Sequence, residues 1–210
     1  GNPTGAVLDD GEMKRLVEMT ASTGCYLILD ETYERFNFSG SFRHPWMERK
    51  EDRVITLGSF SKSLGISGWR LGYLFASREL LEQALKVQDS AVICAPTPAQ
   101  LLMEECLKVP DYTAEKALEV QKRLHLCREA LNLAQGLQWR DAGGGFFTLA
   151  ACPGTTGDDA ARILLERYGI GTIPGSAFGE SGEAHLRISF GCLSDDQLAP
   201  AMEKLASVRL

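Results

Sequence analysis

Short apolar runs that alternate with helical patterns constrain the fold of this chain more than any other feature. Three such runs, CYLILD, VITLGSF and RLGYLFA, occupy residues 25–30, 54–60 and 70–76. A continuous apolar run of this length is typical of a strand buried on both faces of a parallel sheet. Because helical patterns lie before and after these runs, the first half predicts an α/β domain with a mostly parallel sheet covered by helices.

The second half of the chain predicts a smaller α+β domain. Residues 112–135 carry the longest helical pattern, and GGG then precedes an apolar strand pattern at 146–151. Further helix and strand patterns follow at 158–168, 170–173, 185–190 and 194–208. Proline stops a helix because it lacks the amide hydrogen, and Pro110 ends the helical pattern before the long one. We therefore expect two domains, residues 1–110 and residues 111–210.

Composition excludes several classes of protein. With 44% apolar and 24% charged residues, the chain is an ordinary globular protein rather than a disordered one. A net charge of −6 argues against a general nucleic-acid binder, which needs a concentrated basic face. No apolar run approaches the roughly 20 residues of a membrane span. We therefore expect neither nucleic acid nor a membrane as a partner.

The six cysteines indicate a reducing compartment. They are spread along the chain without any CxxC pair, and the three histidines show no ligand spacing with them. A disulfide framework is typical of much shorter secreted chains, and a zinc site needs closely spaced ligand pairs. We expect reduced thiols, no metal site and a cytoplasmic protein.

Two charged residues follow predicted strands. Asp30 ends the first apolar run, so its carboxylate should lie at the C-terminal edge of the sheet, where open α/β sheets bind ligands. Lys62 follows the second run, in a loop rich in serine and glycine whose hydroxyl and amide groups suit a phosphate. A lysine in such a loop could form a Schiff base. The simpler alternatives are a turn acid at Asp30 and a solvated surface lysine at Lys62.

Two arginines interrupt apolar strand patterns. Arg70 opens the third run, and a buried lone guanidinium would be costly, so it should have an anionic partner. That partner is either a phosphate or a nearby Asp or Glu. Arg187 lies between Leu186 and Ile188, which should face the other way along the strand. It is either a carboxylate-binding residue or half of a structural ion pair.

Five short motifs occur in one order, and together they suggest a family. They are NPTG at 2–5, D-x-x-Y at 30–33, S-x-S-K at 59–62, GWRLGY at 68–73 and RISF at 187–190. With these motifs the sequence closely resembles the fold-type I, pyridoxal 5′-phosphate-dependent aminotransferases of class I/II. The resemblance implies that residues 1–110 are the C-terminal part of the cofactor-binding large domain and that residues 111–210 are the small domain.

The resemblance assigns three catalytic residues around the cofactor ring. Lys62 looks like the lysine that binds the cofactor covalently and moves the proton of the reaction. Asp30 looks like the acid that pairs with the pyridinium nitrogen. Tyr33 resembles the residue that, together with Asn2, hydrogen-bonds the ring oxygen. Considered alone, Tyr33 could be a packing residue and Asn2 a turn residue.

The resemblance also assigns the phosphate and the substrate. Ser59 and Arg70 resemble phosphate ligands, and Ser61 is expected to assist them. Arg187 resembles the arginine that binds the substrate α-carboxylate, with Asn2 beside it. The implied reaction moves an amino group between a 2-amino acid and a 2-oxo acid.

Family members are much longer than this chain and begin well before the NPTG turn. We therefore expect a fragment that lacks the N-terminal half, is inactive alone and is unstable or aggregates because strand edges would be open. The full-length enzyme is expected to be a homodimer. Two alternatives remain open: a lyase or synthase on the same fold, and the aminotransferase-like effector domain of a transcription regulator.

Overall fold

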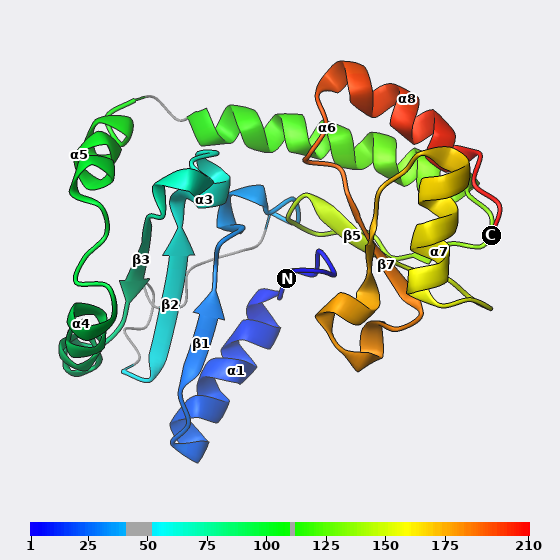
Figure 1. Cartoon of the computed structure of the whole chain (residues 1–210). Helices are drawn as coiled ribbons and strands as arrows, with labels where there is room; N and C mark the ends of the chain where they lie inside the picture. Colours follow the sequence, from blue (N-terminus) through cyan, green and yellow to red (C-terminus); the bar gives the residue numbers. More distant parts are fainter. Residues whose placement is uncertain (41–51, 110–111) are drawn as a thin grey trace. The chain divides into compact units, whose positions relative to one another are not determined.

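The computed structural model describes residues 1–40, 52–109 and 112–210, and the chain divides into two compact units (Figure 1). We call Leu8–Arg35 with Gly40–Lys116 the N-terminal unit. The C-terminal unit consists of Gly1–Val7, Phe36–Ser39 and Ala117–Leu210. The expected boundary at residues 110 and 111 lies outside the described residues. Each unit contains segments from more than one part of the sequence, so a single boundary does not separate the two units. The assignment of two domains, residues 1–110 and 111–210, stays a prediction.

The N-terminal unit is built on a three-stranded sheet in the order β1–β2–β3. Its elements are α1 (Asp10–Thr23), β1 (Leu27–Asp30), η1 (Glu34–Phe36), β2 (Val54–Ser59), α3 (Phe60–Ser63), η2 (Ser67–Trp69), β3 (Gly72–Phe75), α4 (Arg78–Ala91) and α5 (Thr97–Cys106). β1 and β2 are parallel, as the sequence predicts, whereas β3 is antiparallel to β2. The reversal is possible because the link from β2 to β3 stays at one end of the sheet and contains no crossover helix.

Helix α1 begins and ends at the residues whose chemistry favours those positions. The Asp9 carboxylate accepts from the Glu12 amide at 2.7 Å, and the Glu12 carboxylate accepts from the Asp9 amide at 2.9 Å. This reciprocal pair satisfies two amide groups that the first helical turn leaves without partners. Gly24 ends the helix with a left-handed φ of 70°, a conformation that glycine adopts without steric cost.

Strand β1 is buried on one face only. Leu29 packs with Val17 of α1 and Val54 of β2 in a small apolar cluster. Ile28, which points to the other face, is 60% exposed. The sequence predicted burial on both faces, and this is wrong for β1 because no described residue covers the Ile28 side.

The helices that follow β3 also leave apolar side chains in contact with water. No residue of α4 is buried. The large apolar residues exposed on and after α4 and α5 include Leu85, Val87, Leu101, Leu102 and Leu107. Exposed apolar surface of this kind is typical of a face that binds another protein surface.

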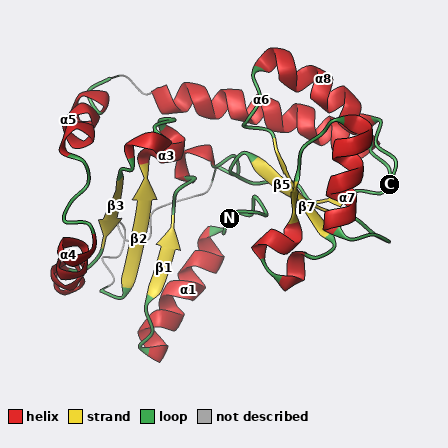
Figure 2. Cartoon of the chain, viewed as in Figure 1, coloured by secondary structure: helices red, strands yellow, loops and turns green. Residues whose placement is uncertain are grey.

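The C-terminal unit is an antiparallel sheet in the order β4–β5–β7–β6, with helices packed beside it (Figure 2). Its elements are α6 (Tyr112–Leu133), which begins in the N-terminal unit, β4 (Gln138–Trp139), β5 (Phe147–Ala151), α7 (Gly157–Ile163), η3 (Leu164–Tyr168), β6 (Ile173–Pro174), η4 (Gly175–Phe178), η5 (Glu180–Gly182), β7 (His185–Ser189) and α8 (Asp195–Ala206). Leu124 of α6, Leu164 of η3, Leu186 of β7 and Leu205 of α8 share one apolar core. The predicted α+β organisation of this half is therefore found.

The described helices include none with both the length and the apolar character needed to cross a bilayer.

Thiol reactivity tests the placement of the cysteines. All six are free, and Cys127 and Cys152 are buried. Burial raises the pKa of Cys127 to about 12 and that of Cys152 to about 11, so both stay protonated at neutral pH. The thiolate is the form that reacts with Ellman's reagent. At pH 8 the reagent should therefore modify the exposed Cys25, Cys94 and Cys192 at least about 100-fold faster than the buried Cys127 and Cys152. Peptide mass spectrometry after timed labelling measures each rate, and fast modification of native Cys127 would contradict the packing.

Candidate functional site

The strand directions bring several predicted residues to one edge of the N-terminal unit. Asp30 ends β1 and Ser59 ends β2, and because these strands are parallel both lie at the same end of the sheet. β3 runs the opposite way and its first residue, Gly72, pairs with Ser59. Arg70 precedes Gly72 by two residues, so it lies at this end as well. We call this end the β1–β2 edge.

Lys62 lies on a helical turn that begins directly after β2. The Ser59 hydroxyl oxygen caps this turn by accepting from the Ser61 amide at 3.2 Å. The amide of Leu64 donates to the carbonyl of Phe60 at 3.1 Å, which closes the turn. The sequence predicted a loop for these residues, and this is wrong because they form the hydrogen-bonded turn α3. Lys62 is partly exposed on a turn whose backbone is fixed at both ends.

The Asp30 carboxylate is oriented by the turn that follows it. Its Oδ1 atom accepts from the Thr32 amide at 3.0 Å and from the Thr32 hydroxyl at 2.6 Å. No hydrogen bond to its Oδ2 atom occurs within the described residues, and Asp30 is exposed. The turn leads on to Tyr33, which is partly buried just before η1. One carboxylate oxygen is therefore held, and the other is accessible to a positively charged ligand atom.

Arg70 is exposed, which differs from the burial predicted for it. It lies in the turn before β3, with a left-handed φ of 56°, and its Nη1 atom donates to the Ser67 carbonyl at 2.8 Å. Arg70 avoids the cost of desolvation because a turn at the end of a sheet stays in contact with water. No ion pair of Arg70 is found in the described ranges of the chain. Together with the hydroxyls of Ser59 and Ser61, this guanidinium forms a donor set suited to a phosphate.

Tyr73 ties the two turns of this edge together, and the sequence analysis missed it. Its hydroxyl donates to Glu34, next to Tyr33, at 3.1 Å, and its ring lies 5.2 Å from that of Phe60, next to the Lys62 turn. A Cβ added at Gly58 would lie 2.0 Å from the Tyr73 ring, so a side chain at this position would displace the ring. A glycine inside an apolar strand pattern is the sequence signal that could have indicated this close approach.

The remaining predicted residues lie in the C-terminal unit. Arg187 donates from Nη1 to the Asn2 side-chain oxygen at 3.1 Å. The structure thus brings Asn2 and Arg187 together, while Asp30, Tyr33 and the Lys62 turn belong to the other unit. Leu186 and Ile188 are buried on the opposite face of β7, as their alternation with Arg187 predicts.

Backbone hydrogen bonds hold the turn that carries Asn2. The Gly5 carbonyl accepts from the amides of Gly143 and Gly144 at 2.9 and 3.0 Å. Gly5 has a φ of 71°, and a Cβ there would lie 2.6 Å from that of Ala142. The GGG segment therefore forms the surface on which this turn packs.

Two aromatic side chains complete the surroundings of Arg187. The guanidinium carbon lies 5.6 Å from the ring centroid of Phe147 and 5.0 Å from that of Phe178. The Nε atom of Arg187 is buried and has no hydrogen-bond partner. An orphaned donor on a fixed guanidinium is what a site for a carboxylate ligand provides.

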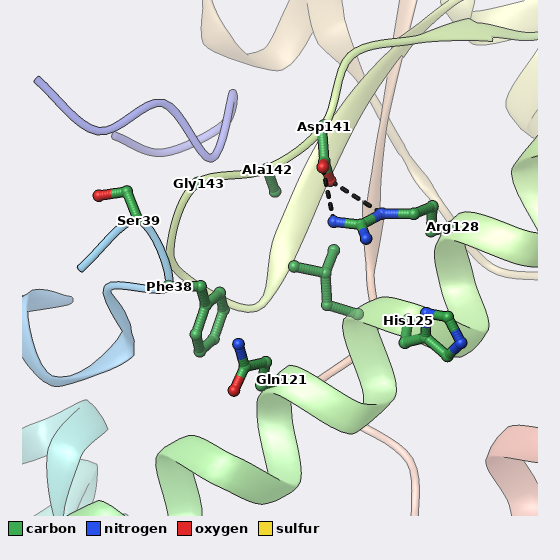
Figure 3. A pocket seen from close by; sticks show the side chains of 9 residues that line it. Phe38, Ser39, Gln121, His125, Arg128, Asp141, Ala142 and Gly143 are labelled. Carbon is green, nitrogen blue, oxygen red and sulfur yellow. Dashed lines mark hydrogen bonds and ion pairs between the residues drawn. The ribbon is translucent and has the colours of Figure 1, made fainter.

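A separate pocket of about 360 Å³ lies in the C-terminal unit against α6 (Figure 3). Phe38, Leu124 and Ala142 supply apolar surface, and Arg128 forms a two-bond ion pair with Asp141 across it, at 2.5 and 3.2 Å. None of the residues predicted for the site lines this pocket. Its one arginine is neutralised by Asp141, so we do not assign it to the reaction.

Within residues 1–40, 52–109 and 112–210, no three side chains of His, Cys, Asp or Glu form a group that could hold a metal ion.

Sequence comparisons extend over almost the whole chain. The sequence model of the family described as aminotransferase class I and II matches residues 1–205. Aromatic aminotransferase ISS1 of Arabidopsis thaliana is 33% identical over 211 residues, which cover 98% of this chain and 52% of that protein. An aspartate aminotransferase of Pyrococcus horikoshii is 27% identical over 209 residues, with 97% and 53% covered.

Solved structures agree with the sequence matches. The aromatic aminotransferase from Pyrococcus horikoshii OT3 has a TM-score of 0.89 and 28% identity, covering 98% of this chain and 57% of that chain. The aspartate aminotransferase from Rhizobium meliloti has a TM-score of 0.88 and 29% identity, with 99% and 56% covered. The chain thus spans about half the length of the relatives that it matches.

The Tyr73–Glu34 contact predicts a pH dependence of stability. Burial, and then the charge of Glu34, raises the pKa of Tyr73 to about 12, against about 10 in an unfolded chain. The unfolded state therefore loses this proton first, and the free energy of unfolding should fall as the pH rises from 10 to 12. Because the hydroxyl is partly exposed, we expect a loss of at most about 1 kcal/mol.

Urea unfolding of the wild type and of Tyr73→Phe at pH 9 and pH 11 measures this loss. The difference in the free energy of unfolding between the wild type and Tyr73→Phe should decrease from pH 9 to pH 11. The thiols of Cys127 and Cys152 also titrate in this range, but they are common to both proteins and cancel in the comparison. A difference in the free energy of unfolding that is the same at both pH values would contradict the raised pKa of Tyr73.

Proposed function

The chain belongs to the aminotransferase class I and II family, and from this membership we propose that it acts in a pyridoxal 5′-phosphate-dependent aminotransferase. The enzyme would move an amino group between a 2-amino acid and a 2-oxo acid. The observation that carries the proposal is Lys62 on the capped turn after β2, at the same sheet edge as Asp30 and Arg70.

The donor set at the β1–β2 edge fits the cofactor. The hydroxyls of Ser59 and Ser61 and the guanidinium of Arg70 would hold its phosphate. The accessible oxygen of Asp30 would pair with the ring nitrogen, and Tyr33 would hydrogen-bond the ring oxygen. When bound, the cofactor supplies an electron sink that weakens the Cα–H bond of the substrate.

Lys62 is the residue proposed to move the proton. Its amine would accept the Cα proton of the substrate and deliver it to the cofactor carbon bonded to the amino nitrogen, which requires a lysine held in one place. The Ser59 cap and the packing of Phe60 on Tyr73 hold the turn from which Lys62 projects. Fixed backbone on both sides limits the motion of the amine to its own side chain.

Arg187 is the residue proposed to bind the substrate carboxylate. Its Nη1 atom is already bound to Asn2, so the guanidinium is oriented before the substrate arrives. A substrate held by its carboxylate presents its Cα–H bond in a restricted direction, which favours proton removal. The role at the cofactor ring predicted for Asn2 stays a prediction.

We further propose that the enzyme is a homodimer in the cytoplasm. The exposed apolar side chains of α4 and α5, among them Leu85, Val87 and Leu101, support burial against a second protein surface. The unpaired cysteines support a reducing compartment.

Substitution of Lys62 tests the proposed function. In the full-length enzyme we expect Lys62→Ala to lower kcat by at least about 100-fold, because the variant loses the group that moves the proton. It should also lose covalent attachment of the cofactor. Borohydride treatment makes the bond permanent, and peptide mapping should find the cofactor on Lys62 in the wild type. Lys204→Ala, at an exposed lysine of α8, is the matched control and should retain both properties.

The products distinguish the alternatives on the same fold. Stoichiometric transfer of the amino group to an added 2-oxo acid supports the aminotransferase. Release of ammonia would instead indicate a lyase, and cofactor attachment without turnover of any amino acid would favour a regulator. Cofactor attached at another lysine would overturn the assignment of Lys62.

A further inference from the structure

Two aromatic rings hold the guanidinium of Arg187. The Phe178 centroid lies 5.0 Å from the guanidinium carbon and the Phe147 centroid 5.6 Å from it. The two rings differ in exposure, since Phe147 is 2% exposed and Phe178 is 38% exposed. A cation over an aromatic face is attracted by the ring quadrupole, and the attraction grows as water is removed. The contact therefore orients Arg187 as well as shielding it.

The hydrogen bonds of Arg187 leave one side of the guanidinium without a protein partner. Nη1 donates to Asn2, whereas Nε is buried and unpartnered. No described residue accepts a hydrogen bond from Nη2. Nε and Nη2 carry two parallel N–H bonds, which match the two oxygens of a carboxylate. The guanidinium can therefore bind Asn2 and a carboxylate ligand at once.

The sheet fixes one of the two rings. Arg187 of β7 pairs with Leu149 of β5, and Phe147 lies two residues before Leu149 on the same face. Phe147 is also packed edge-on against Phe146, at 5.6 Å between centroids. Its place beside Arg187 is thus a consequence of strand register.

The second ring is fixed by a short helical turn. Phe178 ends η4, and Ser176 of this turn donates to the Asp158 carboxylate at 2.9 Å. At its start, a Cβ on Gly175 would lie 2.2 Å from the Gly182 carbonyl oxygen, so the backbone there is closely packed. The turn carries Phe178 to Arg187 from outside the sheet.

We propose that Phe178 is a positioning residue for the substrate carboxylate. With Phe147 and Asn2 it holds the Arg187 guanidinium so that the Nε–Nη2 side binds the carboxylate. The inference rests on the proposed function, and it extends it to a residue that acts through Arg187 rather than on the reacting atoms.

Two variants of Phe178 test the role of the ring in the cofactor-loaded protein. Phe178→Leu keeps an apolar side chain but removes the aromatic face, and Phe178→Tyr keeps the face. We expect Phe178→Leu to raise KM for an amino acid by about 5- to 30-fold with kcat within about twofold, and Phe178→Tyr to restore the wild-type KM. The corresponding amine, which lacks the carboxylate, is the matched control, and its KM should not change.

Binding of a carboxylate that cannot react separates this inference from the proposed function. Calorimetry with 3-phenylpropanoate should detect binding to the wild type, loss of binding in Arg187→Gln and a weaker affinity in Phe178→Leu by the same 5- to 30-fold. A wild type that binds the carboxylate through Arg187 but transfers no amino group would end the proposed function and leave this inference intact. Unchanged affinity in Phe178→Leu, equal effects on amino acid and amine, or unchanged affinity in Arg187→Gln would overturn it.

Discussion

The parallel pairing of β1 with β2 is the constraint on which the candidate cofactor side of this protein depends. Leu27 lies opposite Val54 and Asp30 opposite Leu57, so the two strands end together. Burial of Leu29 and Val54 against α1 favours this register, because a slip by one residue would turn each side chain to the other face. Asp30 and the Lys62 turn keep their common edge only in this register.

The two arginines of the candidate site show how differently one residue type is accommodated. Arg70 lies in an exposed turn, where water compensates its charge and an anion can displace that water. Arg187 lies in one of the two inner strands of its sheet, near two aromatic rings and beside a side-chain amide. The first is suited to a phosphate that arrives with its own charge, and the second is oriented in advance for a carboxylate.

Local chemistry was sufficient to predict much of the fold. The apolar runs at 25–30 and 54–60 predicted β1 and β2, and the Asp9 cap and the Gly24 stop of α1 likewise act within a few residues. The direction of β3 and the exposure of Ile28 were not predicted correctly. Both depend on which elements pack beside a strand, and the apolar run of a strand does not specify those elements.

The candidate site likewise contains residues that the sequence predicted and residues that it did not. Motif order pointed to Lys62, Asp30 and Arg187, and the family match agrees with the resemblance on which their roles rest. No sequence pattern predicted that Tyr73 hydrogen-bonds Glu34 or that Phe178 packs on Arg187.

Residue types, their order and the local turns follow from the chain because capping, periodicity and steric limits act over short distances. Contacts between distant residues need the folded chain. Asn2 and Arg187 are 185 residues apart in sequence, and they meet because the Gly5 turn packs on the Gly143–Gly144 backbone beside the sheet. The rings around Arg187 likewise come from separate elements, and strand register together with the η4 turn decides which side chains face the guanidinium.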